Sequence, residues 1–147
     1  MTLEQFSKIY SLCEHNYSIS TWRHVTSVME YVKQDLLYRF YPEETRRYLC
    51  ALAIAHDAIE ENACTVTQLV TLGLYLQDLC ALTRCDNETY EEYINNLFKT
   101  GSQCAILVKK ADMRDHLIKK ETLTPELKEK YSSVANYFCE QAGRFEV

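Results

Sequence analysis

The stretch LCALAIAHDAIEEN, residues 49 to 62, runs from seven apolar residues straight into a group of charged ones. A helix that is apolar on every side is normally buried, so residues 49–55 predict a helix at the centre of the protein. His56, Asp57, Glu60 and Glu61 follow at once, and buried carboxylates need a partner such as a metal ion or a cation. The alternative interpretation is that the chain re-enters solvent at this point.

Length and composition are those of a single globular domain. The chain has 147 residues, of which 47% are hydrophobic, and we expect one domain over residues 1–147 with a core of its own. Its seven cysteines are odd in number and form no CxxC pair, and the N-terminus has no basic region followed by an apolar block. We therefore expect free thiols and a cytoplasmic protein.

The charge of the chain restricts its partners. A net charge of −5 and a pI near 5.4 disfavour a nucleic-acid polymer as the main ligand, because proteins that bind one are usually basic. A membrane is disfavoured too, because no segment approaches the roughly 18 to 20 apolar residues that a span needs. A small phosphorylated molecule is compatible with an acidic protein where a metal ion supplies the positive charge.

The spacing of apolar residues predicts an all-α protein, a compact bundle of about seven to eight helices. One apolar stripe with helical period runs through Val25, Val28, Met29, Val32 and Leu36. There is no alternating run bounded by hairpin turns, which a strand would need. Helices are expected near 3–15, 21–40, 43–61, 65–72, 75–83, 88–99, 102–119 and 125–143.

Capping residues mark several of the expected helix starts. Pro42 is followed by two glutamates, which is typical of a first helical turn with acids near the positive end of the dipole. Thr65 and Gln68 have the spacing of a capping box, and Ser102 follows a glycine as an N-cap.

Two further segments place a metal-ligating residue on an inward helical face. His56 lies four residues after Leu52, which puts it on the buried stripe of its helix. In ILVKKADMRDHL (106–117), Asp112 lies four residues after Val108 and shares its face. His24, in TWRHVTSV, lies at the edge of the inward stripe of the 21–40 helix. A lone histidine there is usually a satisfied core residue, but three separate helices offering such residues favour a common site.

Two imidazoles and two carboxylates form a mixed nitrogen and oxygen set suited to manganese, iron or zinc. Such a metal binds a phosphoryl oxygen as a Lewis acid and lowers the pKa of its water. Glu60 and Glu61, one turn beyond the ligands, are then placed to orient that water or to shuttle protons.

The sequence resembles the HD-domain metal-dependent phosphohydrolases, and most of all the hydrolase domain of RelA/SpoT-type alarmone enzymes and small stand-alone alarmone hydrolases. The resemblance runs from about His15 to Leu117 and starts with His24 as the first histidine. AHDAIEEN is similar to the family's HDxxED. LCALTRCDNETYEEYINNL (79–97) is similar to its LT[KR] segment and to the YxEYI helix of its small members. VKKADMRDHL is similar to the helix that supplies the last aspartate.

This resemblance implies an activity, a cofactor and a set of site residues. The reaction is hydrolysis of the 3′-pyrophosphate of guanosine tetra- or pentaphosphate, releasing pyrophosphate and GDP or GTP. Glu60 and Glu61 are the implied catalytic acids. The implied cofactor is Mn²⁺, with another divalent transition metal as the alternative. Its implied ligands are His24, His56, Asp57 and Asp112.

The sequence departs from the family pattern beside the expected nucleotide. The family usually has asparagine one turn after the final aspartate, where this chain has His116, whose hydrogen bonds differ from those of an amide. The loop before the first histidine usually carries adjacent basic residues, but EHNYSISTW has none, and Arg23 supplies the nearby positive charge. Tyr17 is a candidate to stack on a base, although an aromatic residue there is more often core. Lys109, three residues before Asp112, is a candidate to bind substrate phosphate.

Three functions remain open on these patterns. The first is a manganese-dependent pyrophosphohydrolase acting on an alarmone or a similar small nucleotide. The second keeps the fold and the metal but acts as a phosphatase on another nucleotide. The third is a non-catalytic HD domain that binds a nucleotide or a protein. The segment 125–143 has apolar residues at helical spacing, which suit packing or dimerisation and leave a homo-oligomer open.

Overall fold

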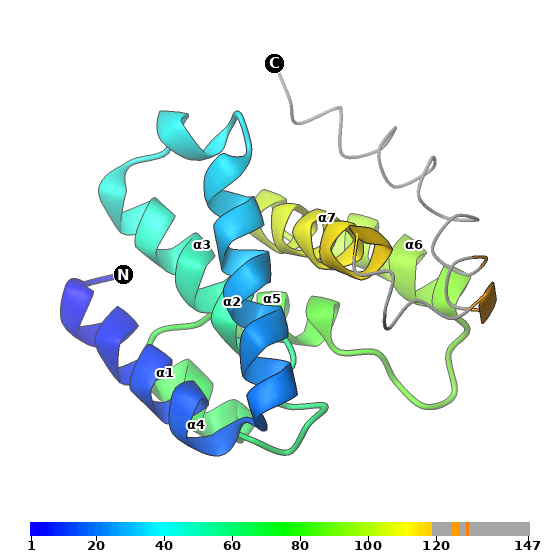
Figure 1. The fold of residues 1–147 in the computed structure, drawn as a ribbon, viewed down its shortest axis with the longest axis horizontal. Coiled ribbons are helices and arrows are strands. Elements are labelled where there is room, and N and C mark those ends of the chain that lie inside the picture. The colour runs from blue at the N-terminus through cyan, green and yellow to red at the C-terminus, as the bar shows by residue number, and fades with distance from the viewer. Residues whose placement is uncertain (119–124, 127–128, 130–147) are drawn as a thin grey trace.

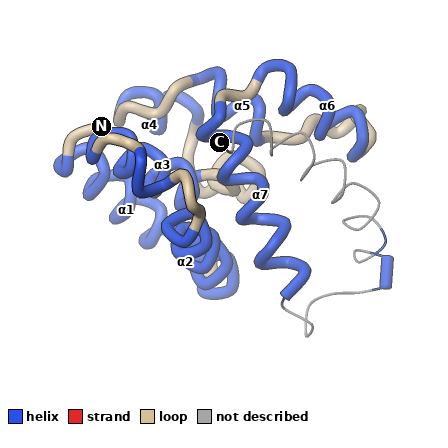
Figure 2. The backbone as a smooth tube through the Cα atoms, turned by 90° about the horizontal axis from the view of Figure 1, so that it is seen from above, coloured by secondary structure: helices blue, strands red, loops and turns tan. Residues whose placement is uncertain are grey.

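The computed structural model describes residues 1–118, 125, 126 and 129 (Figure 1). Over these residues the chain folds into seven α-helices and one short 3₁₀ helix without a strand, which confirms the predicted all-α class (Figure 2). Most of the expected segment 125–143 lies outside the described residues. No described helix is both long enough and apolar enough to cross a membrane. The elements are α1 (Leu3–Asn16), α2 (Ile19–Gln34), η1 (Tyr38–Phe40), α3 (Glu43–Ala55), α4 (Val66–Thr71), α5 (Leu76–Leu82), α6 (Tyr90–Thr100) and α7 (Gln103–Ile118).

The helix starts follow the capping residues of the sequence. The Thr65 hydroxyl accepts the backbone N–H of Gln68 at 3.1 Å, and the Gln68 side chain accepts the Thr65 N–H at 2.9 Å, which completes a capping box. The Ser102 hydroxyl accepts a backbone N–H at the start of α7. Pro42 occupies the position before the first residue of α3, with both glutamates in the first turn. The three predicted starts are confirmed.

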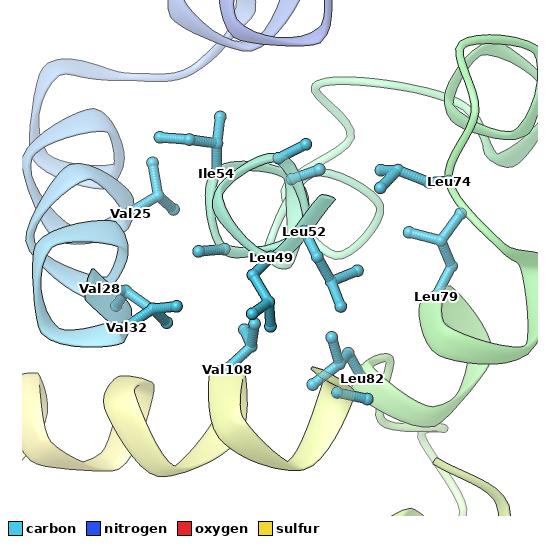
Figure 3. Packing of buried hydrophobic residues seen from close by; sticks show 14 of the residues in the cluster. Val25, Val28, Val32, Leu49, Leu52, Ile54, Leu74, Leu79, Leu82 and Val108 are labelled. Atoms are coloured by element: carbon cyan, nitrogen blue, oxygen red, sulfur yellow. The ribbon is translucent and has the colours of Figure 1, made fainter. Parts of the chain in front are cut away.

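Helix α3 lies at the centre of the fold, as residues 49–55 predicted. Every residue from Tyr48 to Ala55 is buried. Helix α2 packs against both α3 and α7, and α1 packs against α3. Figure 3 shows valines of α2 facing Leu49 and Ile54 of α3, while Val108 of α7 approaches α3 from another side. This arrangement brings the inward faces of α2, α3 and α7 to one region of the core.

Helix α2 ends earlier than the sequence predicted. It stops at Gln34, and the 21–40 helix is replaced by a break followed by η1. At the break the Asp35 carboxylate accepts the backbone N–H of Leu37 at 3.0 Å, a local bond that competes with helix continuation. Leu36, expected on the inward stripe, is 72% exposed as a result. That part of the prediction was wrong.

Helix α3 also ends early, at Ala55 rather than residue 61. Ala58 donates its N–H to Ala55 across three residues instead of four, which tightens the chain into turns. The turns close at Asn62, whose φ of 56° is a left-handed conformation that asparagine tolerates better than most residues. The expected 43–61 helix was therefore wrong in its last part. Glu60 and Glu61 lie on this turn segment and not on a regular helix.

The burial of α3 makes a direct prediction for stability. Leu52 is 0% exposed, so Leu52→Ala should lower the free energy of unfolding by about 2–5 kcal/mol through lost contacts and a residual cavity. Leu36→Ala removes the same atoms from an exposed site, so it should change the free energy of unfolding by less than about 0.5 kcal/mol. Urea unfolding followed by circular dichroism, in a chelator, measures both. Equal losses in the two variants would contradict the assigned position of Leu36.

Candidate metal centre

The four ligands implied by the resemblance come together in the structure. His24 projects from the middle of α2, His56 caps the C-terminal end of α3, and Asp57 follows it. Asp112 projects from the second half of α7. One ligand atom from each of His24, His56 and Asp112 lies within 4.8 Å of the other two, which makes the group able to hold a metal ion. His24 and Asp112 are in direct contact, although they lie 88 positions apart in the chain.

The donor atoms converge closely. His24 Nε2 lies 2.8 Å from Asp112 Oδ1 and 3.5 Å from Asp57 Oδ2. His56 Nε2 lies 3.3 Å from both Asp112 Oδ1 and Asp57 Oδ1. Both imidazoles therefore present the same ring nitrogen to the same two carboxylates.

The opposite nitrogen of each imidazole is held by a fixed acceptor. His56 Nδ1 lies 2.6 Å from the backbone oxygen of Ala53, and His24 Nδ1 lies 2.7 Å from Asp115 Oδ2. A carbonyl or carboxylate oxygen can only accept, so both Nδ1 atoms carry the proton. This places the metal-binding lone pair of each neutral ring on Nε2, toward the centre. Hydrogen bonding of this kind is what orients metal-ligating histidines in proteins.

Asp115 is a residue of the candidate site that the sequence analysis did not single out. Its side chain is 1% exposed, and it holds His24 from α7. The signal was present in the sequence, because Asp112 and Asp115 are three residues apart and so share a helix face. When two acids lie on the buried face of one helix, one can bind a metal ion while the other orients a histidine that binds it.

The donor separations fit a transition-metal site. Ligand atoms about 2.0–2.2 Å from a central ion lie roughly 2.8–3.1 Å from their neighbours in an octahedron and roughly 3.3–3.6 Å in a tetrahedron. The contacts of His24 and His56 with the two carboxylates span 2.8 to 3.5 Å. These residues can thus hold a divalent ion with small adjustments of the side chains.

The carboxylates change the pKa values of the two imidazoles. Burial lowers the pKa of His56, but Asp57 and Asp112 outweigh it and raise that pKa to about 9. The pKa of His24 is raised as well, because its bonds to Asp112 and Asp115 outweigh burial. Each ring has to lose its Nε2 proton before that atom can bind a metal, so protons and metal ions compete at this centre.

Lys109 balances the charge of Asp112. Its ammonium donates to Asp112 Oδ2 at 2.8 Å and lies 5.1 Å from the ring centre of Tyr93. Burial raises the pKa of Asp112, but Lys109 and the three imidazoles around it lower it well below its ordinary value. Lys109, expected to bind substrate phosphate, is 8% exposed and donates instead to the candidate ligand Asp112.

A cavity of about 160 Å³ opens beside the centre. The candidate ligands His56, Asp57 and Asp112 line it together with Lys109, and His116 does so one turn further along α7. The remaining lining comes from elements on the other side of the cavity: Glu60, Leu82, Arg84, Tyr90 and Tyr93.

Glu60 and Glu61, both expected to be catalytic, are placed differently. Glu60 lines the cavity, and its Oε1 accepts the backbone N–H of Arg84 at 2.9 Å. Glu61 is exposed and is not among the residues that line the cavity.

Two residues expected near the nucleotide also lie outside the cavity lining. Arg23 is exposed on α2. Tyr17 is 9% exposed, and its hydroxyl donates to the backbone oxygen of Ile54 at 2.7 Å. Tyr17 therefore joins the α1–α2 corner to the end of α3, in the core position that was the alternative interpretation. Trp22 packs against Tyr17 and Tyr10 in the same region.

Comparison of the chain with protein-family models, with curated proteins and with solved structures finds no match.

The contact between Asp115 and His24 makes a prediction for metal affinity. Asp115→Asn removes the charge that fixes His24, so we expect Mn²⁺ affinity to fall about 10- to 100-fold. Asp35→Asn is a matched control, because Asp35 contacts Lys110 of the same helix α7 but does not line the cavity. Competition with a fluorescent chelator measures both affinities. Unchanged affinity in Asp115→Asn, or an equal loss in the control, would count against a positioning role.

Proposed function

We propose that the protein is a metal-dependent phosphohydrolase whose substrate is a small phosphorylated nucleotide. The first candidate reaction is removal of the 3′-pyrophosphate from guanosine tetra- or pentaphosphate with Mn²⁺ as cofactor. The observation that carries the proposal is the convergence of His24, His56 and Asp112, which Asp57 also contacts, with both Nδ1 atoms tied to acceptors. The sequence resemblance selects the reaction class.

In this proposal the residues of the site have separate roles. His24, His56, Asp57 and Asp112 hold the ion, which when bound supplies Lewis acidity toward a phosphoryl oxygen and lowers the pKa of a coordinated water. Glu60 accepts a proton or orients the attacking water from the cavity wall. The backbone N–H of Arg84 fixes the Glu60 carboxylate in that position.

The size of the cavity limits what it can enclose. Its volume of about 160 Å³ is below the roughly 300–1,000 Å³ of sites that enclose a drug-sized ligand. It suits a phosphoryl or pyrophosphoryl group, while the nucleoside lies on the surface outside it. Arg23 and Tyr17 do not line this cavity, which favours a second candidate, a phosphatase of the same mechanism acting on another nucleotide.

A substrate panel tests the proposal. It contains guanosine and adenosine alarmones, nucleoside mono- and triphosphates and NADPH, each with Mn²⁺ and with a chelator. We expect chelator-sensitive release of pyrophosphate from the guanosine alarmones. Release of phosphate from another member alone would keep the mechanism and support the second candidate.

Variants of the ligands and of a distant histidine control this experiment. His56→Ala should abolish release and Mn²⁺ uptake together, while His15→Ala, an exposed site on α1, should preserve both. Binding of Mn²⁺ and nucleotide by the unaltered protein without any turnover would contradict the proposal and favour a non-catalytic binding protein.

The placement of the two glutamates gives a sharper prediction. Glu60→Gln should lower kcat about 10²- to 10⁴-fold, because it removes a proton acceptor from the cavity but keeps an oxygen for the Arg84 N–H. Glu61→Gln should leave kcat nearly unchanged. Initial rates on the best panel substrate measure both, and Mn²⁺ affinity should stay constant in each variant. A larger loss in Glu61→Gln would reverse the assignment.

A further inference from the structure

Three of the protein's four histidines gather at one carboxylate oxygen, although the four ligands proposed above include only two of them. The third is His116, which lies one turn after Asp112 on α7. Its Nε2 is 3.3 Å from Asp112 Oδ1, the same distance as for His56 Nε2. The ring of His116 lies 4.5 Å from that of His24, centre to centre. His116 therefore contacts the centre itself as well as lining the cavity.

We propose that His116 is a fifth ligand of the metal, so that the centre has three nitrogen and two oxygen donors. The inference rests on the proposed metal centre and deepens it. The side chain of His116 is 34% exposed, so its ring can reach the cavity and adjust to an ion more freely than the two other imidazoles. Helical spacing explains the placement, because residues four apart stand above one another on the same face of α7.

The nitrogen of His116 changes which metal ions the centre is expected to bind best. Imidazole suits zinc, iron, copper and nickel, whereas oxygen donors suit magnesium and manganese. Two imidazoles with two carboxylates leave Mn²⁺ a good fit. A third imidazole moves the preference toward Zn²⁺, Fe²⁺ or Co²⁺, and it fills a position otherwise left for water or substrate oxygen.

The competing role for His116 is a hydrogen bond to substrate. Metal binding measured without substrate separates the two roles, because a residue that contacts only substrate leaves that affinity unchanged. His116→Asn is the informative variant, since an amide keeps hydrogen bonding to substrate but is a poor ligand for these metals. His15→Asn makes the same change at an exposed position on α1.

The experiment uses the full chain freed of metal and titrated with Zn²⁺, Co²⁺ and Mn²⁺ in competition with a chelator. We expect His116→Asn to weaken Zn²⁺ and Co²⁺ binding by about tenfold or more, to weaken Mn²⁺ binding much less, and to change the visible absorption of bound Co²⁺. His15→Asn should match the unaltered protein in all three. Equal affinities and an unchanged Co²⁺ spectrum in His116→Asn would overturn the inference.

A second measurement needs no variant and so does not depend on its folding. X-ray absorption at the zinc edge of the loaded, unaltered protein counts the coordinated imidazoles. Three support the fifth ligand, and two overturn it. Failure of the unaltered protein to bind any of the metals would instead contradict the proposed function itself. Metal lost in His56→Ala but kept unchanged in His116→Asn would overturn the fifth ligand alone.

Discussion

The buried carboxylate of Asp112 is the interaction on which the arrangement of the site depends. It is 4% exposed, and leaving such a charge unpaired inside a protein costs several kcal/mol. The fold satisfies its two oxygens separately. Lys109 of the same helix binds Oδ2, while Oδ1 faces imidazoles from α2, α3 and α7. The three helices therefore have to meet with their inward faces at one point.

Helix α3 has three alanines among its buried residues, and these let its neighbours approach closely. Ala51, Ala53 and Ala55 are at most 1% exposed, and none fills the space between α3 and its neighbours as a larger side chain would. Valines of α2 and Val108 of α7 approach α3 from different sides (Figure 3). The apolar run ends at His56, the first residue with a polar side chain. The apolar run that buries α3 therefore also places the imidazole of His56 in the core.

The sequence predicted the meeting of His24, His56 and Asp112 better than it predicted the helix ends, and for a physical reason. The positions of His24, His56 and Asp112 follow from helical period, which is set by backbone geometry. The ends of α2 and α3 depend on a few local hydrogen bonds, such as the one from Leu37 to Asp35, that periodicity does not contain. Leu36 and Glu61 were misplaced for that reason. Asp115 could have been found, because it repeats the Asp112 position at helical spacing.

The balance of charge gives a reason why the proposed phosphate chemistry would need a cation. Asp57, Glu60 and Asp112 line the cavity with Lys109 and Arg84, so three acids against two bases leave it negative while its histidines are neutral. Asp115 behind His24 adds another negative charge. Raised pKa values of His24 and His56 show that the site attracts positive charge, supplied there by protons. With both imidazoles neutral and no ion bound, a phosphoryl group would be repelled from this cavity. A divalent ion in place of the two protons keeps the charge balance of the carboxylates and provides the positive contact that a phosphate oxygen requires.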